Sequence, residues 1–318
     1  MLYGHRPIVV RQNSLYMKKI YLLIIISTLY WGQVKAQQDP LYAQYINNPM
    51  VINPAYTGIN NLLNASLSYR SQWAGFNDAP TTTALSAHSS FFENKVGGGI
   101  LLVRDQLGST VNTQFNVTYA YKIEFTEHTL SFGLQTGVLN LRDDNSELNP
   151  RDPDDEAFAG DQNISKFNFG AGLILKGDDF FLGLSVPRLV NNQEQFGTLE
   201  SEVYQRHFYF SGGYIYHVGA GFALKFAGLL KSVSGSPLSM DYNAAVVLRD
   251  KYTLGVLSRN FQTYGLLAQL NISDNLRFGY VFEVPTNQSV GTSFTSHEVT
   301  LTVDFAVLDF HFLNERYF

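Results

Sequence analysis

The chain has 318 residues, no cysteine and a formal net charge of −5, with charged residues making up only 15% of it and aromatic residues 14%. That length allows one large β domain or two ordinary domains. The absence of cysteine excludes disulfides and thiolate metal sites, and an acidic balance without Lys/Arg clusters argues against nucleic-acid binding.

The first element along the chain is an export signal. The stretch MKKIYLLIIISTLYWGQVKAQQ begins at Met17 with two lysines, continues through an apolar run (20–31) and ends in a small-x-small cleavage site, VKA. These are the three regions of a secretory signal peptide. The apolar run is shorter than the ~20 residues that a membrane-spanning helix needs, which disfavours a retained anchor. We therefore expect residues 1–16 to be a non-native upstream extension, residues 17–36 to be the signal peptide, and the mature chain to begin near Gln37.

Residues 37–61 form a separate N-terminal segment, and strand-like alternation dominates from residue 62 to residue 318. In VNTQFNVTYAYK (111–122), apolar and polar residues alternate along the whole stretch. Period-two alternation indicates a strand with two differently solvated faces. The same pattern predicts about fourteen strands, at 63–73, 81–91, 96–104, 110–123, 129–140, 166–176, 179–187, 205–217, 220–231, 237–248, 251–259, 262–271, 275–284 and 297–306.

The connections between these strands sort by parity. After even-numbered strands they are short: ENK, FTEH, GDD, VG, RD and ISDN. After odd-numbered strands come longer ones, including 142–165, 188–205 and 285–296. This segregation is typical of outer-membrane barrels, whose short turns are periplasmic. We predict an all-β fold: a transmembrane outer-membrane β-barrel of about 14 antiparallel strands, with short periplasmic turns, longer extracellular loops, both termini in the periplasm and a short C-terminal tail. The alternative is a soluble double-sheet protein with the aromatic residues in its core.

The residues of such a barrel have expected places. The 26 glycines fit inward positions where side chains must be small, and tyrosines suit the membrane interfaces. Charges of both signs face the lumen, where they allow either a salt-bridge network that plugs the barrel or a lined pore. These inward charges are Arg70, Lys225, Asp241, Arg277, Glu283, Glu298 and Asp304.

Two groups of residues invite a chemical interpretation. Asp152, Asp154 and Glu156 stand at alternate positions, as calcium ligands can, but the EF-hand glycine and terminal glutamate are missing. A solvated loop is the better interpretation. His88 and His297 suit a surface hydrolase, but no G-x-S-x-G nucleophile motif accompanies them. We therefore predict no enzymatic activity, no cofactor and no metal.

The mature chain carries a distinctive series of motifs. It opens QQDPLYAQYINNPMVINPAYTG, continues YRSQWAGFNDAPTTTALSAHS, and later includes LSFGLQTG, FFLGLSVPRLV, RHFYFSGGYIY and LLKSVSGSPLSMDYNAAVVL. This series resembles the PorP/SprF family of type IX secretion system membrane proteins from Bacteroidetes. The resemblance runs from about Gln38 to Phe318 in the family's order.

The resemblance implies an integral outer-membrane barrel that serves protein secretion. Members support the export or surface anchoring of cargo with C-terminal sorting domains, including gliding adhesins, and have no known catalytic residues or cofactor. The implied partners are other secretion-system subunits, secreted cargo and outer-membrane lipid. A passive porin for small solutes is the alternative function. Partner identity is expected to depend on the acidic loop 142–165, so the cargo does not transfer by analogy.

Eight residues match the family's motifs and are our candidates for a plug or a partner-binding surface. They are Asn53, Pro54, Tyr56, Gly58, Tyr69, Arg70, Trp73 and Gly75. The alternative is that Asn-Pro and Gly merely shape a turn before the first strand.

Overall fold

The structure, a computed structural model, describes residues 43, 45–145, 160–190, 192–196, 199–286 and 292–311. All of them belong to one compact unit, Gln37–Phe318. The predicted upstream extension, the signal peptide and the candidate calcium loop with Asp152, Asp154 and Glu156 lie outside the described residues.

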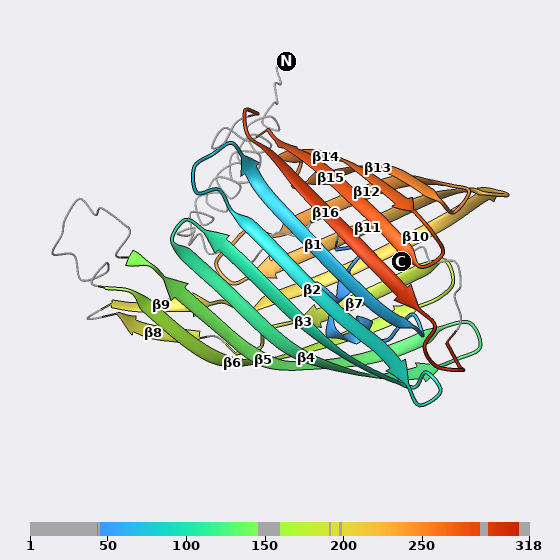
Figure 1. The fold of residues 1–318 in the computed structure, drawn as a ribbon, viewed down its shortest axis with the longest axis horizontal. Helices are drawn as coiled ribbons and strands as arrows, with labels where there is room; N and C mark the ends of the chain where they lie inside the picture. The colour runs from blue at the N-terminus through green and yellow to red at the C-terminus, as the bar shows by residue number, and fades with distance from the viewer. Residues whose placement is uncertain are drawn as a thin grey trace, which may run out of the picture. The chain divides into compact units, whose positions relative to one another are not determined.

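A closed antiparallel barrel is the main element of the described chain (Figure 1). Fourteen strands of the described residues form it, each paired with its neighbours in chain order, and the first strand pairs with the last. They are β1 (Leu63–Ala74), β2 (Thr81–Phe91), β3 (Val96–Leu107), β4 (Thr110–Glu124), β5 (Thr129–Asp143), β6 (Gln162–Lys176), β7 (Phe180–Val186), β10 (His207–Gly219), β11 (Phe222–Val233), β12 (Ser239–Leu248), β13 (Tyr252–Arg259), β14 (Thr263–Asn271), β15 (Leu276–Pro285) and β16 (Thr295–Phe305). The predicted fold is confirmed.

Two further strands, β8 (Asn192–Phe196) and β9 (Leu199–Tyr204), pair with each other outside the barrel ladder. They fall in a stretch that the sequence predicted to be a loop. Two short 3₁₀ turns, η1 (Pro49–Val51) and η2 (Pro54–Tyr56), precede β1. In the described ranges, no helix has the length and apolar character needed to cross a membrane.

Strands β5 and β6 extend several residues beyond their predicted ends, 140 and 166. Their added residues pair in register, from Asn140 opposite Ser165 to Asp143 opposite Gln162. Outward polar side chains bond to each other here, since Asn140 Nδ2 donates to Asn163 Oδ1 at 2.6 Å and to Ser165 Oγ at 2.9 Å. The ladder therefore continues where the apolar alternation has ended, which is why periodicity missed it.

The predicted segregation of loop lengths holds at one rim and is mixed at the other. All even-numbered connections of the barrel are short, from the β2–β3 turn (92–95) to the β14–β15 turn (272–275). On the odd rim, the long connections lie beside two short turns, 108–109 and 260–262. Left-handed backbone at Gly108, with φ +58°, makes so tight a turn possible.

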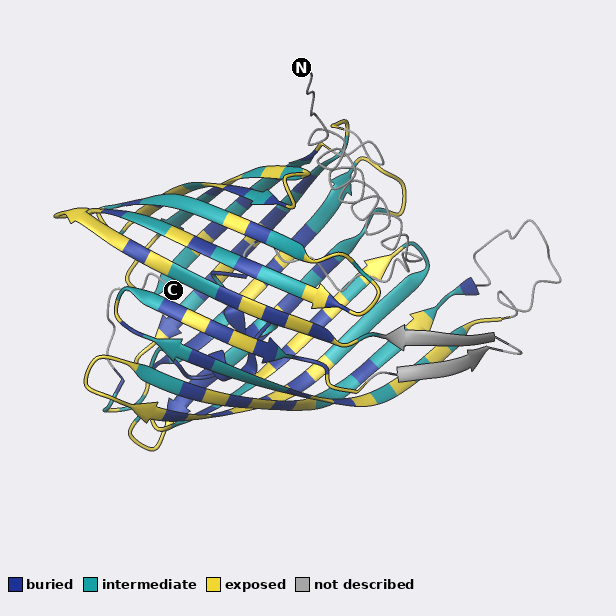
Figure 2. Cartoon of the chain, turned by 180° about the vertical axis from the view of Figure 1, so that it is seen from behind, coloured by how far each residue is buried: buried dark blue, intermediate teal, exposed yellow. Residues whose placement is uncertain are grey.

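Burial alternates along the strands as predicted (Figure 2). On β4, Asn116 and Thr118 are 2% exposed, whereas Val117 is 49% exposed and Tyr119 48%. Closing the sheet pairs every barrel strand on both sides, so that an apolar exterior can face lipid without unpaired backbone groups. This is the construction of a transmembrane β-barrel.

The short C-terminal stretch after β16 packs against the β2–β3 turn. Asn94 Nδ2 donates to the Phe310 carbonyl at 3.1 Å, and a ring nitrogen of His311 lies 3.0 Å from Ser90 Oγ. The stretch after the last strand therefore lies at the rim of short turns.

The interior of the barrel is filled by residues Tyr45–Leu62, here called the lumenal segment, whose blue trace lies within the ring of strands in Figure 1. Tyr45, Ile46 and Ile52 pack in one apolar cluster with inward residues of β7, β10, β11 and β12. Met50 and Ala55 belong to a second cluster with residues of β2, β3 and β6. The protein's apolar core is therefore made between this segment and the inner wall.

Candidate functional site in the barrel lumen

The lumenal segment makes a capped turn at Asn53. The Asn53 Oδ1 atom accepts the Ala55 N–H at 2.9 Å, which is the N-cap of η2. Pro54 follows at the first helical position, where a missing N–H costs nothing. The Asn53 Nδ2 group donates to the carbonyls of Leu173 on β6 at 3.2 Å and Leu184 on β7 at 3.3 Å. One buried side chain thus shapes the turn and attaches it to the wall.

Wall side chains bind the backbone of this segment. Ser185 Oγ on β7 donates to the Ile52 carbonyl at 2.6 Å, and Ser131 Oγ on β5 donates to the Ala55 carbonyl at 2.6 Å. Lys122 Nζ on β4 donates to the carbonyl of Gly58 at 2.7 Å. The Gly58 N–H in turn donates to His88 Nδ1 on β2 at 3.1 Å. Main-chain groups that would be costly to bury unpaired are therefore satisfied by the barrel.

Glycines make room for the segment's backbone. A Cβ atom placed on Gly97, Gly133 or Gly172 would lie 2.0 Å from an atom of the lumenal segment. At Gly97 and Gly133 that atom belongs to the backbone, so the wall accepts only glycine there, whereas at Gly172 it is the side-chain Oδ1 of Asn53. The expectation of inward glycines is correct here, whereas Gly212 and Gly228 pair across β10 and β11 among residues that face outward.

The start of the segment at Tyr45, and Ala43 just before it, contact the opposite wall. The Ala43 N–H donates to Glu298 Oε2 on β16 at 2.7 Å, and Asn243 Nδ2 on β12 donates to Tyr45 Oη at 2.9 Å. Tyr45 is 1% exposed, and burial, reinforced by the charge of Asp241, raises the pKa of its phenol above the ordinary value.

A buried charge network lies beside this end. Arg70 pairs with Glu283 and, at 3.3 Å, with Glu298, while Arg259 pairs with Asp241 at 3.0 Å and lies 3.7 Å from Glu283. Each of the five is at most 9% exposed. The predicted inward positions of Arg70, Asp241, Glu283 and Glu298 are therefore correct.

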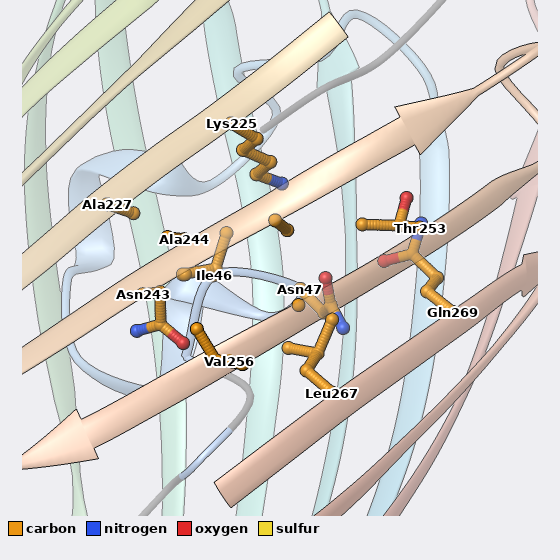
Figure 3. A pocket seen from close by; sticks show the side chains of 12 residues that line it. Ile46, Asn47, Lys225, Ala227, Asn243, Ala244, Thr253, Val256, Leu267 and Gln269 are labelled. Atoms are coloured by element: carbon orange, nitrogen blue, oxygen red, sulfur yellow. The ribbon is translucent and has the colours of Figure 1, made fainter. Parts of the chain in front are cut away.

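The remaining predicted inward charges lie nearer the rim of short turns. Arg277 Nη2 lies 3.6 Å from Asp304 Oδ2. Lys225 lines a small pocket between the lumenal segment and β11–β14, together with Asn47, Asn243 and Gln269 (Figure 3). The lumen thus keeps a small recess on this side, in which these polar side chains stand among a mainly apolar lining.

Arg259 was missed by the sequence analysis, as was the contact that Lys122 makes with the segment. The available signal was register: Arg259 lies directly opposite Asp241 on the neighbouring strand. Along β13, Arg259 and Thr253 also lie on the same face of the strand. Because Thr253 is buried, the Arg259 side chain is expected to face the lumen as well.

The eight candidate residues separate into three groups. Asn53, Pro54, Tyr56, Gly58 and Arg70 are buried inside the barrel. Tyr69 is 50% exposed and faces outward. Trp73 lies where the β1–β16 register shifts, and its backbone N–H donates to Ser296 Oγ at 3.2 Å. Gly75 lies in the β1–β2 turn with φ +95° and open space around it.

The two histidines considered for catalysis are held apart. His88 is 2% exposed in the lumen, with its ring edge-on to Tyr56. His297 lies on the outward-facing side of β16. Its Nδ1 atom lies 2.8 Å from Tyr280 Oη, and its Nε2 atom lies 3.0 Å from Thr295 Oγ1. The barrel wall lies between them, so they form no common site.

Comparison with solved structures finds other outer-membrane barrels. The chain is similar to the Acinetobacter baumannii outer membrane protein Omp33, at 8% identity over 77% of this chain and 100% of that chain, with a TM-score of 0.45. It is similar to the CymD monoaromatic hydrocarbon channel, at 10% identity over 85% and 94% of the two chains, with a TM-score of 0.47. A third is the Pseudomonas putida toluene transporter TodX, at 9% identity over 86% and 95%, with a TM-score of 0.44.

No curated protein sequence matches this chain closely enough to count as a relative. The model of one protein family does match, that of the type IX secretion system membrane protein PorP/SprF, over residues 34–303. The match covers most of the closed barrel together with the segment in its lumen, and it confirms the resemblance noted in the motifs. The chain therefore belongs to the PorP/SprF family of type IX secretion system membrane proteins and is an integral β-barrel of the outer membrane.

Proposed function

We propose that this protein is a non-enzymatic docking component of the type IX secretion system. In this role the barrel holds secreted cargo, or other subunits of the secretion machine, at the outer membrane. Cargo with C-terminal sorting domains, gliding adhesins among them, is the class that the family suggests. Family membership supports the secretion role, and the filled lumen supports docking over transport.

The lumenal segment is the observation that carries this proposal. Its side chains or backbone bond to β2, β4, β5, β6, β7 and β12, which lie around the barrel wall. Met50, Ala55 and Thr57 have no exposed surface at all. A solute path through this level of the barrel would require the segment to leave, at the cost of these contacts.

Partner contacts would then be made at the rims rather than through the lumen. Of the motif residues, Trp73 and Gly75 lie at the rim that carries the longer loops. These two are our candidates for direct contact with a partner. The five buried motif residues would act indirectly, by fixing the segment inside the barrel.

Affinity purification of the tagged protein from outer membranes tests this proposal. We expect secretion-system subunits or cargo to co-purify and to be identified by mass, with a tagged unrelated outer-membrane barrel as the control. Recovery of the barrel alone, even after gentle crosslinking, would contradict a docking role. A Trp73→Ala variant that folds normally should lose partners before Tyr69→Ala does, because Tyr69 faces outward from the barrel wall.

A passive porin is the second candidate. The small pocket to which Lys225, Asn243 and Gln269 contribute polar groups among a mainly apolar lining favours it, since it leaves part of the lumen beside the segment unfilled. Planar-bilayer recordings separate the two functions. Sizeable, steady conductance of the intact chain would support a porin, and a closed barrel would reject it.

A further inference from the structure

We infer that the inner wall of β2–β7 is a peptide-binding site for the backbone of an Asn-Pro turn, occupied in this structure by the chain's own residues 53–58. The ligand class is therefore a peptide, and a partner protein that presents the same turn could take the place of the resident one. This inference deepens the proposed docking function and rests on it.

Recognition of main-chain groups is the first argument. The wall supplies donors to three carbonyls of the segment, at every third residue (Ile52, Ala55 and Gly58), and an acceptor for the Gly58 N–H. These groups are present in any peptide. A wall that hydrogen-bonds to main-chain groups recognises the conformation of a peptide backbone, much as sheet edges bind added strands.

Shape is the second argument. A Cβ on any of three inward glycines would lie 2.0 Å from an atom of the segment: a backbone atom at Gly97 and Gly133, and the side-chain Oδ1 of Asn53 at Gly172. The glycines come from three different strands, so the turn approaches the wall closely over an extended surface. A ligand without this turn would not fill the same space.

The side chains of the turn that contact the wall define the sequence of the ligand. Asn53 is required because it both caps the turn and bonds to two wall carbonyls. Ala55 is fully buried, so only a small residue fits there. Tyr56 packs edge-on against His88, with the ring centroids 5.8 Å apart. Thr57 has no exposed surface either, and its Oγ1 lies 2.9 Å from Thr118 Oγ1 on β4. The ligand is thus an Asn-Pro-small-aromatic-Thr-Gly peptide.

Two ammonium groups extend the site beyond the turn. Lys122 Nζ donates to the side-chain oxygen of Asn61, and Lys176 Nζ donates to that of Asn60. Both acceptors are neutral amides. A peptide with carboxylates at these two positions would form charge-assisted bonds with the same lysines, and we expect it to bind more tightly than the resident sequence.

The test uses the full chain with a protease recognition sequence inserted between Asn61 and Leu62, cleaved after folding. The probe is a labelled synthetic peptide of residues 43–61. The control peptide has the same composition, with residues 53 and 54 in reversed order. We expect the cleaved segment to stay bound through purification and the labelled peptide to exchange into the barrel at one per chain, with the control failing to enter.

Substitutions in the wall provide the matched comparison. Gly133→Ala places a Cβ 2.0 Å from Ala55 N, whereas Gly228→Ala places one on the outer surface at an ordinary 3.5 Å from the nearest atom. We expect Gly133→Ala to release the cleaved segment at least about tenfold faster, and Gly228→Ala to leave release unchanged.

Three results would overturn the inference: loss of the cleaved segment from the unsubstituted barrel, equal exchange of both peptides, or retention without any exchange. If the insertion prevents folding, hydrogen exchange of the uncleaved chain serves instead, with faster exchange at lumenal-segment amides in Gly133→Ala but not in Gly228→Ala. Equal exchange in both would also overturn it. Co-purification of partners with the uncleaved chain is scored separately, so the docking function can stand where peptide exchange fails.

Discussion

Arg70 on β1 and Glu298 on β16 are direct cross-strand partners where the first and last strands of the barrel pair, with 3.3 Å between Arg70 Nη1 and Glu298 Oε2. The same carboxylate oxygen accepts the N–H of Ala43 at 2.7 Å. One buried carboxylate therefore contacts both the seam where the barrel closes and the N-terminal part of the chain.

Replacing Arg70 by methionine should strongly destabilise the barrel. The substitution leaves the buried carboxylates of Glu283 and Glu298 without their closest cation, a loss that typically costs about 3–5 kcal/mol. The urea midpoint of unfolding, followed by heat-dependent gel mobility, measures the effect. Arg142→Gln is the control, because its pair with Asp144 is largely exposed and should be worth less than about 1 kcal/mol. Equal midpoints for the two variants would contradict the network's role.

Asn53→Ala should loosen the lumenal segment. It removes the cap of η2 and leaves two wall carbonyls without their donor, which we expect to cost about 1–3 kcal/mol. Limited proteolysis of folded protein measures release of the segment. Asn140→Ala removes two hydrogen bonds on the exposed outer face and should leave cleavage of the segment unchanged. Protection of the segment in both variants would mean that Asn53 does not hold it.

Val117→Arg should impair the membrane-embedded barrel. Val117 faces outward between Phe115 and Tyr119, so a charge there meets lipid and should cost about 2–4 kcal/mol. Thr113→Arg lies on the same face, beside Arg104 and Asn140 in register, where the exterior is already polar. Its cost should be about 0–1 kcal/mol. The yield of folded protein in the outer membrane distinguishes them, and equal yields would contradict the assignment of the lipid-facing band.

The barrel could be predicted from the sequence because each strand carries its own signal. On β4, polar residues from Asn112 to Lys122 alternate with apolar ones, and this local pattern separates the two faces of the strand. The parity of the loop lengths then indicated that the apolar face meets lipid and the polar face lies inside the barrel. Alternation fails where the outward face also carries polar residues, such as Asn140 and Ser165, which is why the ends of β5 and β6 were not found.

The interior could not be predicted in the same way. The stretch around Asn53 has no periodicity, and its conformation depends on atoms far along the chain, such as the carbonyl of Leu184. The partner of Arg259 depends on the register between β12 and β13, which alternation within one strand does not specify. Motif matching named Asn53 and Gly58, but only their contacts indicate what they do.

Engineered cysteine pairs test most directly whether the segment lies inside the barrel, since the native chain has no cysteine. Thr57 Oγ1 and Thr118 Oγ1 are 2.9 Å apart, so Thr57→Cys with Thr118→Cys should form a disulfide in intact outer membranes, seen as a reducible change in gel mobility. Thr57→Cys with Val117→Cys should not, because Val117 faces the opposite side of the wall. No crosslink in the first pair, or equal crosslinking in both, would contradict the account.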